Sequence, residues 1–545
     1  MRILSVQAST MTKCRLIGGY LSTALPGIST VIMVGLVINM PDSWMFVVIT
    51  VTCHVFVVAY TIRACYSTVL VCNRIKYTAN DHQQEKRPIQ AIFVPNYNET
   101  RDTLRENLSM LACHEYAAQY YEVYLAMEQT EQEAEEKGSD LVREFGSLFR
   151  YITYTIHPQN LPGEARGKSS NLRWVSRVAS DRYDSLMQSN VIFTAMDADT
   201  HLLPSYFDQI SSYCSTHGTD NHTMFVAPIV FDRNAAAVSP LVRCADVLWS
   251  TAGIAGLFPT STVKTPTSVY SITMTLARYV GFWDPGSEAI GEDLHMYLKC
   301  FFATRGNLIS VSVYSPASHC NVEHSDVLPH MPRRERWILS QHARFQQACR
   351  HMWGIVDAGY AVRALFALVT DYTIKGLDEK YGIENDNETV PWWRVVVLMH
   401  RLYEAHFLPV HYLIDVLACS LLPLFIAVKP NSVLDYVLVY TNHLRTAAFF
   451  GVVIQMVLYE RLHSTALALR LVTIRNAPPG LIKNSLEHVG VSARRGWIYC
   501  LDYILFPVAG TVFGAVPAIK AQAMQFYTTR FAYKVSSKPS FRHAI

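Results

Sequence analysis

The sequence predicts an α/β domain with a mostly parallel sheet, joined to membrane-spanning helices. Two observations lead to this fold class. Half of the 545 residues are apolar and 17% are charged, whereas soluble globular proteins carry about 25% charged residues. The middle of the chain alternates short apolar or β-branched runs with polar, helix-forming stretches, the pattern of parallel strands with helices between them.

Composition and charge exclude several classes of function. The net charge is +3, from 47 Lys and Arg against 44 Asp and Glu, so the concentrated basic face of a nucleic-acid-binding protein is not indicated. Twelve cysteines are scattered without a C-x-x-C pair, which argues against a zinc ribbon and a disulfide scaffold. Dispersed thiols suit the cytosol or a membrane.

Residues 1–72 are expected to form an N-terminal transmembrane hairpin. Residues 16–37 and 44–62 are apolar and uncharged, and each run is close to the roughly 20 residues that cross a bilayer as a helix. The first run is longer than the core of a signal peptide, which disfavours that alternative. Basic residues flank the hairpin on both sides and place its two ends in the cytosol: Lys13, Arg15, Arg63, Arg74 and Lys76.

Residues 73–330 are expected to form the α/β domain. Its predicted strands are residues 89–94, 121–127, 151–156 and 191–196. In sheets of this kind, ligands bind at the carboxyl ends of the strands. The informative side chains of this domain are therefore sought where the predicted strands end.

The remainder of the chain is expected to return to the membrane. Residues 331–390 are predicted to form interfacial helices, among them an amphipathic stretch at 343–353 that contains Arg344. Residues 391–545 are predicted to form a C-terminal transmembrane region, with apolar runs at 407–428, 433–459 and 497–519. A basic loop between the last two runs should be cytosolic; it contains Arg461, Arg470, Arg475, Lys483, Arg494 and Arg495. Charged residues inside these runs should face protein or a polar cavity, or lie near a span end.

Candidate binding residues follow the first three predicted strands. Pro95, Tyr97 and Glu99 follow the first strand and Glu128 ends the second; a structural turn and a surface glutamate are the alternatives. Lys168 lies in a Gly-Lys-Ser sequence, but a phosphate loop would need glycine where Pro162 stands. This segment can still form a flexible basic loop near a diphosphate, or a surface loop without function.

Two aspartates follow the fourth predicted strand. Asp197 and Asp199 are separated by one residue, and two carboxylates beside a buried strand are costly unless something uses their charge. Such hard oxygen ligands suit a divalent ion that bridges two phosphates. The pair therefore predicts a metal and phosphate site.

Two further motifs complete the candidate site. Glu292 and Asp293 follow a glycine at a predicted helix start, where a carboxylate can accept a proton from an attacking hydroxyl, or simply cap the helix. Arg333 and Arg336 open another helix. Three residues apart, they share a face and can clamp a diphosphate, or form a solvated basic turn.

The order of these motifs resembles a known family. D-x-D, then G-E-D, then R-x-x-R-W, flanked by membrane spans, resembles the family 2 processive glycosyltransferases, which include cellulose, chitin and hyaluronan synthases. Residues 291–299 and 315–318 are most similar to the fungal family 2 transferases of hyphal surface polysaccharide. The resemblance covers about residues 90 to 360, and Arg333 stands where the family usually has glutamine.

The resemblance implies a fold, a reaction and a role for each site residue. It implies a cytosolic GT-A domain, Rossmann-like, that transfers a sugar from a UDP-sugar with inversion and uses Mg²⁺ or Mn²⁺. In this interpretation Asp293 is the catalytic base, Asp199 holds the metal and Trp337 contacts the acceptor. Glu292 and Arg336 complete the catalytic set. The nucleotide side is formed by Pro95, Tyr97, Glu99, Glu128, Lys168, Asp197 and Arg333.

The resemblance also implies partners and a location. A polysaccharide acceptor and the lipid bilayer are expected, in a multi-pass protein of the plasma membrane whose catalytic domain is cytosolic. The glycosylation sequons at Asn98, Asn107 and Asn221 should then stay unused. Two alternatives remain open: a non-processive transferase that moves one sugar to a lipid phosphate, and a transporter or receptor with an inactive α/β domain.

Overall fold

The centre of the computed structural model is a seven-stranded sheet. The structure describes residues 2–41, 43–75, 87–322, 331–370, 389–477 and 497–528. In spatial order the strands are β3 (Tyr151–His157), β2 (Tyr121–Glu128), β1 (Ile89–Pro95), β4 (Val191–Ala195), β7 (Tyr270–Thr273), β5 (Thr223–Val226) and β8 (Ile309–Ser312). Only β7 runs antiparallel to its neighbours. Strands β6 (Ile229–Phe231) and β9 (Ala317–His319) form a small parallel sheet.

The four expected strands are confirmed, each to within one residue at its end. Strand β1 lies between β2 and β4, with Pro95 opposite Ala126 and Phe93 opposite Ala195, so the carboxyl ends of all three strands share one edge. The chain leaves β1 toward β2 on one side and returns from β3 to β4 on the other. This change of direction between β1 and β4 marks the usual ligand crevice of a doubly wound sheet.

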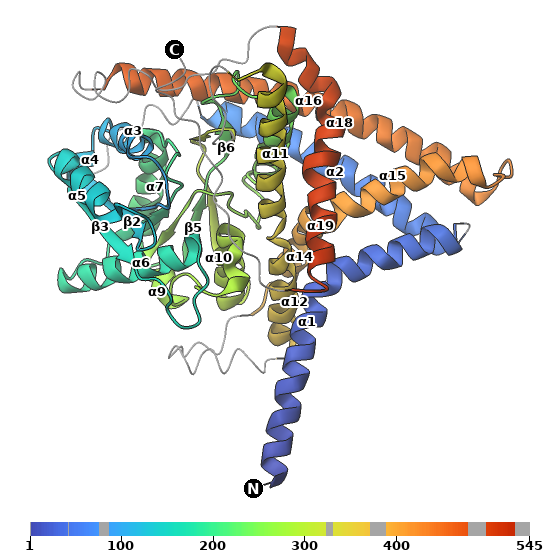
Figure 1. Cartoon of the computed structure of the whole chain (residues 1–545), viewed down its shortest axis with the longest axis horizontal. Helices are drawn as coiled ribbons and strands as arrows, with labels where there is room; N and C mark the ends of the chain where they lie inside the picture. The colour runs from blue at the N-terminus through green and yellow to red at the C-terminus, as the bar shows by residue number, and fades with distance from the viewer. Residues whose placement is uncertain are drawn as a thin grey trace.

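Helices cover both faces of this sheet (Figure 1). One face packs on α3 (Arg101–Ala112), α5 (Ala134–Phe145) and α7 (Pro204–His217), next to the short α4 (Ala117–Tyr120). The other packs on α6 (Lys168–Ser185), α8 (Pro240–Ile254), α9 (Met274–Tyr279) and α10 (Glu292–Ala303), with the 3₁₀ turn η2 (Ser287–Ile290) before α10. Along β1, Ile92 and Val94 enter the first core and Ala91 and Phe93 the second, as alternation along a strand requires. The predicted fold class is confirmed: an α/β domain with a mostly parallel sheet covered by helices on both faces, with long apolar helices beside it.

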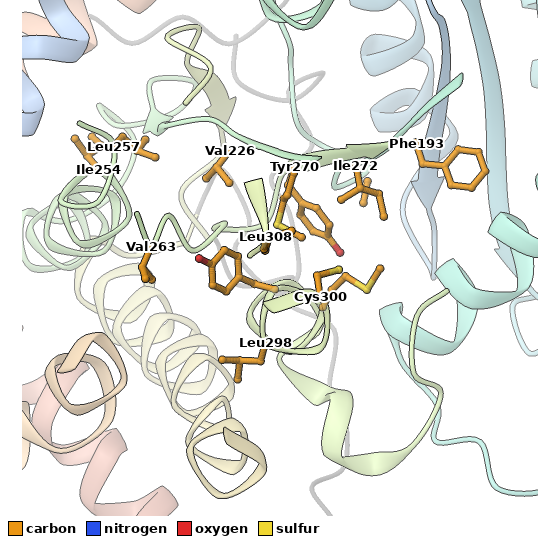
Figure 2. Close-up of a cluster of buried hydrophobic side chains, with 14 of the residues drawn as sticks. Phe193, Val226, Ile254, Leu257, Val263, Tyr270, Ile272, Leu298, Cys300 and Leu308 are labelled. Atoms are coloured by element: carbon orange, nitrogen blue, oxygen red, sulfur yellow. The ribbon is translucent and has the colours of Figure 1, made fainter. Parts of the chain in front are cut away.

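The second core continues from the α/β domain into the flanking helices. Figure 2 shows Phe193, Tyr270 and Ile272 of the sheet beside Leu298 and Cys300 of α10. The same cluster includes buried residues of α2, α16 and α18, namely Val71, Tyr459 and Phe506. The α/β domain and the helical region therefore share one hydrophobic core.

Six helical stretches among the described residues are long and apolar enough to span a membrane: Leu21–Asn39, Trp44–Arg74, Arg333–Thr370, Leu408–Phe425, Val433–Arg475 and Tyr499–Met524. Four of these stretches lie on single helices, namely α1 (Arg2–Asn39), α2 (Trp44–Arg74), α15 (Leu408–Phe425) and α16 (Val433–Arg475). The stretch Arg333–Thr370 comprises α11 (Arg333–Met352) and α12 (Ile355–Thr370). The last stretch comprises η4 (Trp497–Leu501), α18 (Asp502–Gly510), η5 (Thr511–Ala515) and α19 (Val516–Met524). Helix α14 (Trp392–His406) precedes α15. Five of the six match the expected runs, and the sixth falls where interfacial helices were expected.

Helix α11 rests on the α/β domain. Arg344 forms an ion pair of 2.9 Å with Asp246 of α8, and the side chain of Gln341 donates to Ser239 just before that helix. The Arg344 side chain therefore faces the α/β domain, while the interfacial position of this helix stays a prediction. It faces protein because a buried aspartate on α8 requires a cation.

The three aspartates within the apolar runs face protein or lie at a span end, as predicted. Asp415 accepts a hydrogen bond of 3.0 Å from Thr50, and Asp502 pairs with Arg243 of α8 through both carboxylate oxygens. Asp435 lies in the first turn of α16. These contacts lower the cost of burying charge.

A basic loop was expected between the apolar runs 433–459 and 497–519, but its first three arginines lie on a helix instead. Arg461, Arg470 and Arg475 lie on α16, which continues as a helix to Arg475. Arg470 is buried and donates to the backbone oxygen of Asp232 at 3.2 Å, so packing on the α/β domain extends the helix. Lys483, Arg494 and Arg495 lie outside the described residues.

The contact between α1 and α12 gives a test of this packing. A Cβ atom added at Gly359 would lie 2.8 Å from the Cα atom of Thr23, whereas one added at Gly35 would meet nothing within 4 Å. Alanine gains about 1 kcal/mol of helix propensity at either site. We expect Gly359→Ala to lower the free energy of unfolding by roughly 1–3 kcal/mol relative to Gly35→Ala because of overpacking. Thermal unfolding of the detergent-solubilised chain measures this, and equal midpoints would contradict the packing.

Candidate active site

A cluster of three carboxylates around one ammonium group lies where β4 ends. The Nζ atom of Lys168, the first residue of α6, is 2.9 Å from Asp197 and 2.9 Å from Glu292. Asp293 follows Glu292 in the first turn of α10. Burial by itself lowers the pKa of Lys168, but Asp197 and Glu292 outweigh burial and raise the pKa above its ordinary value. The structure thus brings four predicted site residues together.

Ser268 connects the members of this cluster and was missed in the sequence. Its hydroxyl donates to Asp197, its backbone N–H donates to Asp293 at 2.6 Å, and its carbonyl oxygen accepts from Lys168 at 3.0 Å. Ser268 has a φ of 71°, which is uncommon for a residue with a side chain and is found at functional sites.

The sheet register explains why Ser268 reaches this place. Strand β7 is antiparallel to β4, with Tyr270 opposite Ala195. Extending that register by two residues sets Ser268 opposite Asp197. No sequence pattern indicates that β7 enters the sheet beside β4. Without this pairing, Ser268 could not be placed next to Asp197.

Glu292 and Asp293 have different environments. Glu292 is 5% exposed and accepts hydrogen bonds from the hydroxyl of Tyr270 and from the indole N–H of Trp283. Burial raises the pKa of Glu292, Lys168 opposes this rise and Asp293 adds to it. Asp293 is half-buried. Of the two carboxylates, Asp293 is therefore the more accessible to a substrate hydroxyl.

The D-x-D turn is held from behind by α3 and by Arg233. Asn107 of α3 donates to the carbonyl oxygens of Asp197 and Ala198 at 3.3 and 2.8 Å. Arg233 donates to the carbonyl oxygen of Asp199 and pairs with Glu106 of α3. The Asp197 side chain is 29% exposed, whereas Asp199 is 2% exposed. The two aspartates thus have different surroundings.

The donor set at this turn fits a hard divalent ion only in part. Within the residues that the structure describes, no group of three His, Cys, Asp or Glu side chains is placed to hold a metal. Asp197 and Asp199 offer carboxylate oxygens of the kind that Mg²⁺ and Mn²⁺ prefer. A metal here would take its remaining ligands from substrate oxygens and water.

Four of the seven predicted nucleotide-side residues lie at the ends of β1 and β2. Pro95 ends β1, and Tyr97 and Glu99 are partly exposed just beyond it. Glu128 ends β2, where His157 of β3 lies 3.1 Å from it and 2.9 Å from Glu164. Burial lowers the pKa of His157, but its hydrogen bonds with the two glutamates outweigh burial and raise it.

The loop that precedes α6 lies across this edge. The N–H of Ala165 donates to the carbonyl oxygen of Pro285 at 2.7 Å. The guanidinium of Arg166 lies 5.9 Å from the centre of the Tyr97 ring. These contacts set the basic loop that carries Lys168 between the end of β1 and the turn before α10.

Arg333, Arg336 and Trp337 lie on a separate element, the first turn of α11. Arg333 is exposed, Arg336 is half-buried and Trp337 is 49% exposed. The oxygen of Ser340 one turn later donates to the carbonyl oxygen of Arg336 at 2.9 Å. The described contacts of this helix with the α/β domain go to α8, so the proposed diphosphate role of the arginines rests on the sequence.

A comparison with known protein families covers the second half of the α/β domain and part of the helical region. Residues 192–459 match the family model described as glycosyl transferase family group 2. This match supports a family 2 glycosyltransferase domain. The matched residues include the D-x-D, G-E-D and R-x-x-R-W motifs. None of the curated protein sequences compared with this chain matches it.

Solved structures of three glycosyltransferases show a weak likeness. A mannosyltransferase from Pyrobaculum calidifontis, solved with GDP-Man and Mn²⁺, is 13% identical with a TM-score of 0.40, over 75% of this chain and 97% of that one. GalNAc-T7, solved with UDP, GalNAc and Mn²⁺, is 10% identical with a TM-score of 0.32, over 60% of each chain. TarS from S. aureus is 11% identical with a TM-score of 0.29, over 80% of this chain and 90% of that one.

The environment of Glu292 predicts a structural effect of its substitution. Three donors converge on its two oxygens, and glutamine would turn its amide NH2 group, itself a donor, toward one of them. We expect Glu292→Gln to lower the free energy of unfolding by about 1–3 kcal/mol, measured by thermal unfolding. Glu288→Gln is the control, because Glu288 forms a half-exposed pair with Arg363 and should cost less than about 1 kcal/mol. An unchanged midpoint for Glu292→Gln would show that the three donors do not hold this carboxylate.

Proposed function

We propose that this protein is a membrane glycosyltransferase that moves a sugar from a UDP-sugar to the growing end of a polysaccharide. The reaction is an inverting, metal-dependent displacement, and the helical region holds and extrudes the product. The catalytic domain faces the cytosol, where UDP-sugars are available. One observation carries the proposal: Lys168, Asp197, Ser268 and Asp293 meet at the carboxyl edge of β4.

Asp293 is the proposed base. It lies at the start of α10, and Ser268 N–H and Leu294 N–H donate to its two oxygens at 2.6 and 2.8 Å. These donors hold the carboxylate in place, and a carboxylate oxygen of Asp293 can take the proton of the acceptor hydroxyl. The hydroxyl oxygen then attacks the anomeric carbon opposite the departing UDP, and one displacement inverts the configuration.

The leaving diphosphate is negatively charged, and this chain offers cations for it. Lys168 lies next to Asp197, and Arg336 can contribute a planar guanidinium that matches a pair of phosphate oxygens. Mg²⁺ or Mn²⁺ bound by Asp199, with Asp197 nearby, would supply additional charge neutralisation. Glu128, Tyr97 and Glu99 line the strand ends where the uridine would lie.

A UDP-release assay on the purified full chain tests the proposal. Several UDP-sugars are supplied with Mg²⁺ or Mn²⁺, and the product is sized. UDP release together with a polymeric product is expected. Transfer of a single sugar to a lipid phosphate would contradict the polysaccharide acceptor, and no UDP release from any donor would contradict the enzyme itself.

Replacement of the proposed base should separate binding from chemistry. We expect Asp293→Asn to keep UDP binding but to lose sugar transfer by at least about a hundredfold, the usual scale for a general base. Calorimetric UDP binding and initial rates measure the two effects. Asp184→Asn is the matched control, since Asp184 is an exposed partner of Arg278 and should transfer normally. Normal turnover of Asp293→Asn would reduce Asp293 to a helix cap.

Trp337 has two possible roles that one variant distinguishes. An indole beside Arg336 can stack on an acceptor sugar, or it can anchor α11 at the membrane interface. We expect Trp337→Ala to shorten or abolish the polymer while UDP affinity and folding stay intact. A destabilised protein whose folded fraction makes normal polymer would support the anchor instead.

A further inference from the structure

His295 joins the proposed catalytic helix to two other elements. Its Nδ1 atom is 2.7 Å from Asp357 in the first turn of α12, and its Nε2 atom is 3.1 Å from Asp284. Lys299, one turn further along α10, donates to the other oxygen of Asp284 at 2.6 Å. The imidazole therefore bridges two carboxylates that belong to different parts of the chain.

Both partners of His295 are themselves fixed. The carbonyl oxygen of Asp284 accepts from Ser169, the residue after Lys168, at 2.6 Å. Asp357 is fully buried, at the start of a helix in a candidate membrane span. Through these contacts His295 connects the loop of Lys168, helix α10 and helix α12.

Residues two apart on a helix point to different sides. Asp293 and His295, in the first turn of α10, therefore point in different directions. Asp293 points toward Ser268, which donates to it from its backbone N–H. His295 points toward Asp284 and Asp357. The turn that presents the proposed base is thus held from one side by Ser268, just before β7, and from the other by α12.

The approach of α10 to α12 is close at this point. A Cβ atom added at Gly291 would lie 2.8 Å from the Oδ2 atom of Asp357 and 3.3 Å from the Cα atom of Gly354. The Tyr360 ring lies 4.6 Å from the imidazole of His295. A small movement of α12 would therefore be transmitted to the helix start of the G-E-D motif.

We propose that His295 is a positioning residue for sugar transfer, which fixes Asp293 by clamping the first turn of α10 between Asp284 and Asp357. This inference rests on the proposed function, because it takes Asp293 as the base. His295 does not touch the reacting atoms. It acts on the position of the Asp293 carboxylate, two residues before it. Through its contact with α12, it also connects that carboxylate to the helical region.

The protonation of His295 makes the clamp testable by pH. Burial by itself lowers the pKa of His295, but the hydrogen bonds with Asp284 and Asp357 outweigh burial and raise the pKa to about 9. Because the pKa is raised, the contribution of the clamp is complete below about pH 6.5 and is lost as pH rises through about 9. The charged or titratable groups that face this contact are Asp284, Asp293, Lys299, Asp357, Tyr360 and the pair of Glu288 with Arg363.

The experiment compares pH profiles of kcat and KM for the full chain and its variants. In the unmutated protein, kcat should fall as pH rises through about 9. His295→Gln should lower kcat by about tenfold to a hundredfold, the scale of a misplaced catalytic group, with KM for the UDP-sugar little changed and the alkaline fall absent. Asp357→Asn should act alike, and the double variant should lose no more than either single one. Arg63→Gln is the control, because Arg63 forms a pair between α2 and α14 and should leave the profile unchanged.

The failures of the two proposals are distinguishable. A His295→Gln protein with normal kcat per folded molecule and an unchanged alkaline fall would overturn the positioning role. If the unmutated protein turns over no UDP-sugar, the proposed function fails, and thermal unfolding still tests the clamp. The midpoint temperature of unfolding should then decrease as pH rises through about 9 in the unmutated protein. In His295→Gln this decrease should be absent. An identical pH dependence of the two midpoints would overturn the clamp.

Discussion

One ammonium group among three carboxylates is the constraint on which the site depends. Asp197, Glu292 and Asp293 come from two elements far apart in sequence, and their mutual repulsion would separate β4 from α10 without a cation. Lys168 supplies that cation from the first residue of α6. Removing the ammonium group would leave the carboxylates uncompensated, which costs several kcal/mol when the charges are buried. The same charges suit the proposed roles of the site, which are to bind an anionic diphosphate and to hold a carboxylate base.

The fold places this constraint next to the helical region. Helix α10 carries Glu292 and Asp293 on one end and packs through Leu298 and Cys300 into the core shown in Figure 2. That core continues into α2, α16 and α18. Buried ion pairs add direct links, from Asp246 to α11 and from Asp232 to α16. The proposed site therefore lies in the part of the α/β domain that is joined directly to the helical region.

The sequence predicts the parallel half of the sheet well and the site in part. Strands β1 to β4 are continuous apolar or β-branched runs, so their ends and the residues beyond them, Asp197 and Glu128 among them, could be located. Strand β7 has four residues and is antiparallel to its neighbours, and no local pattern marks such a pairing. Ser268 was missed for that reason.

The sequence also did not show which charged residues would be buried and which would be exposed. Arg344 and Asp199 occur in polar stretches, yet both are buried because α8 and Arg233 lie against them. His295 and Asp357 are 62 residues apart, and their contact exists only once α12 packs on α10. Periodicity and motif order locate helices and strands, but they do not show which partner a buried charge will find.

The most direct test of the central claim is a cryo-electron microscopy structure of the full chain with UDP and Mn²⁺. We expect nucleotide density at the edge formed by the carboxyl ends of β1, β2 and β4, with the diphosphate beside Lys168 and Asp197. Nucleotide bound at another place, or an empty edge at a saturating concentration of UDP, would contradict this expectation.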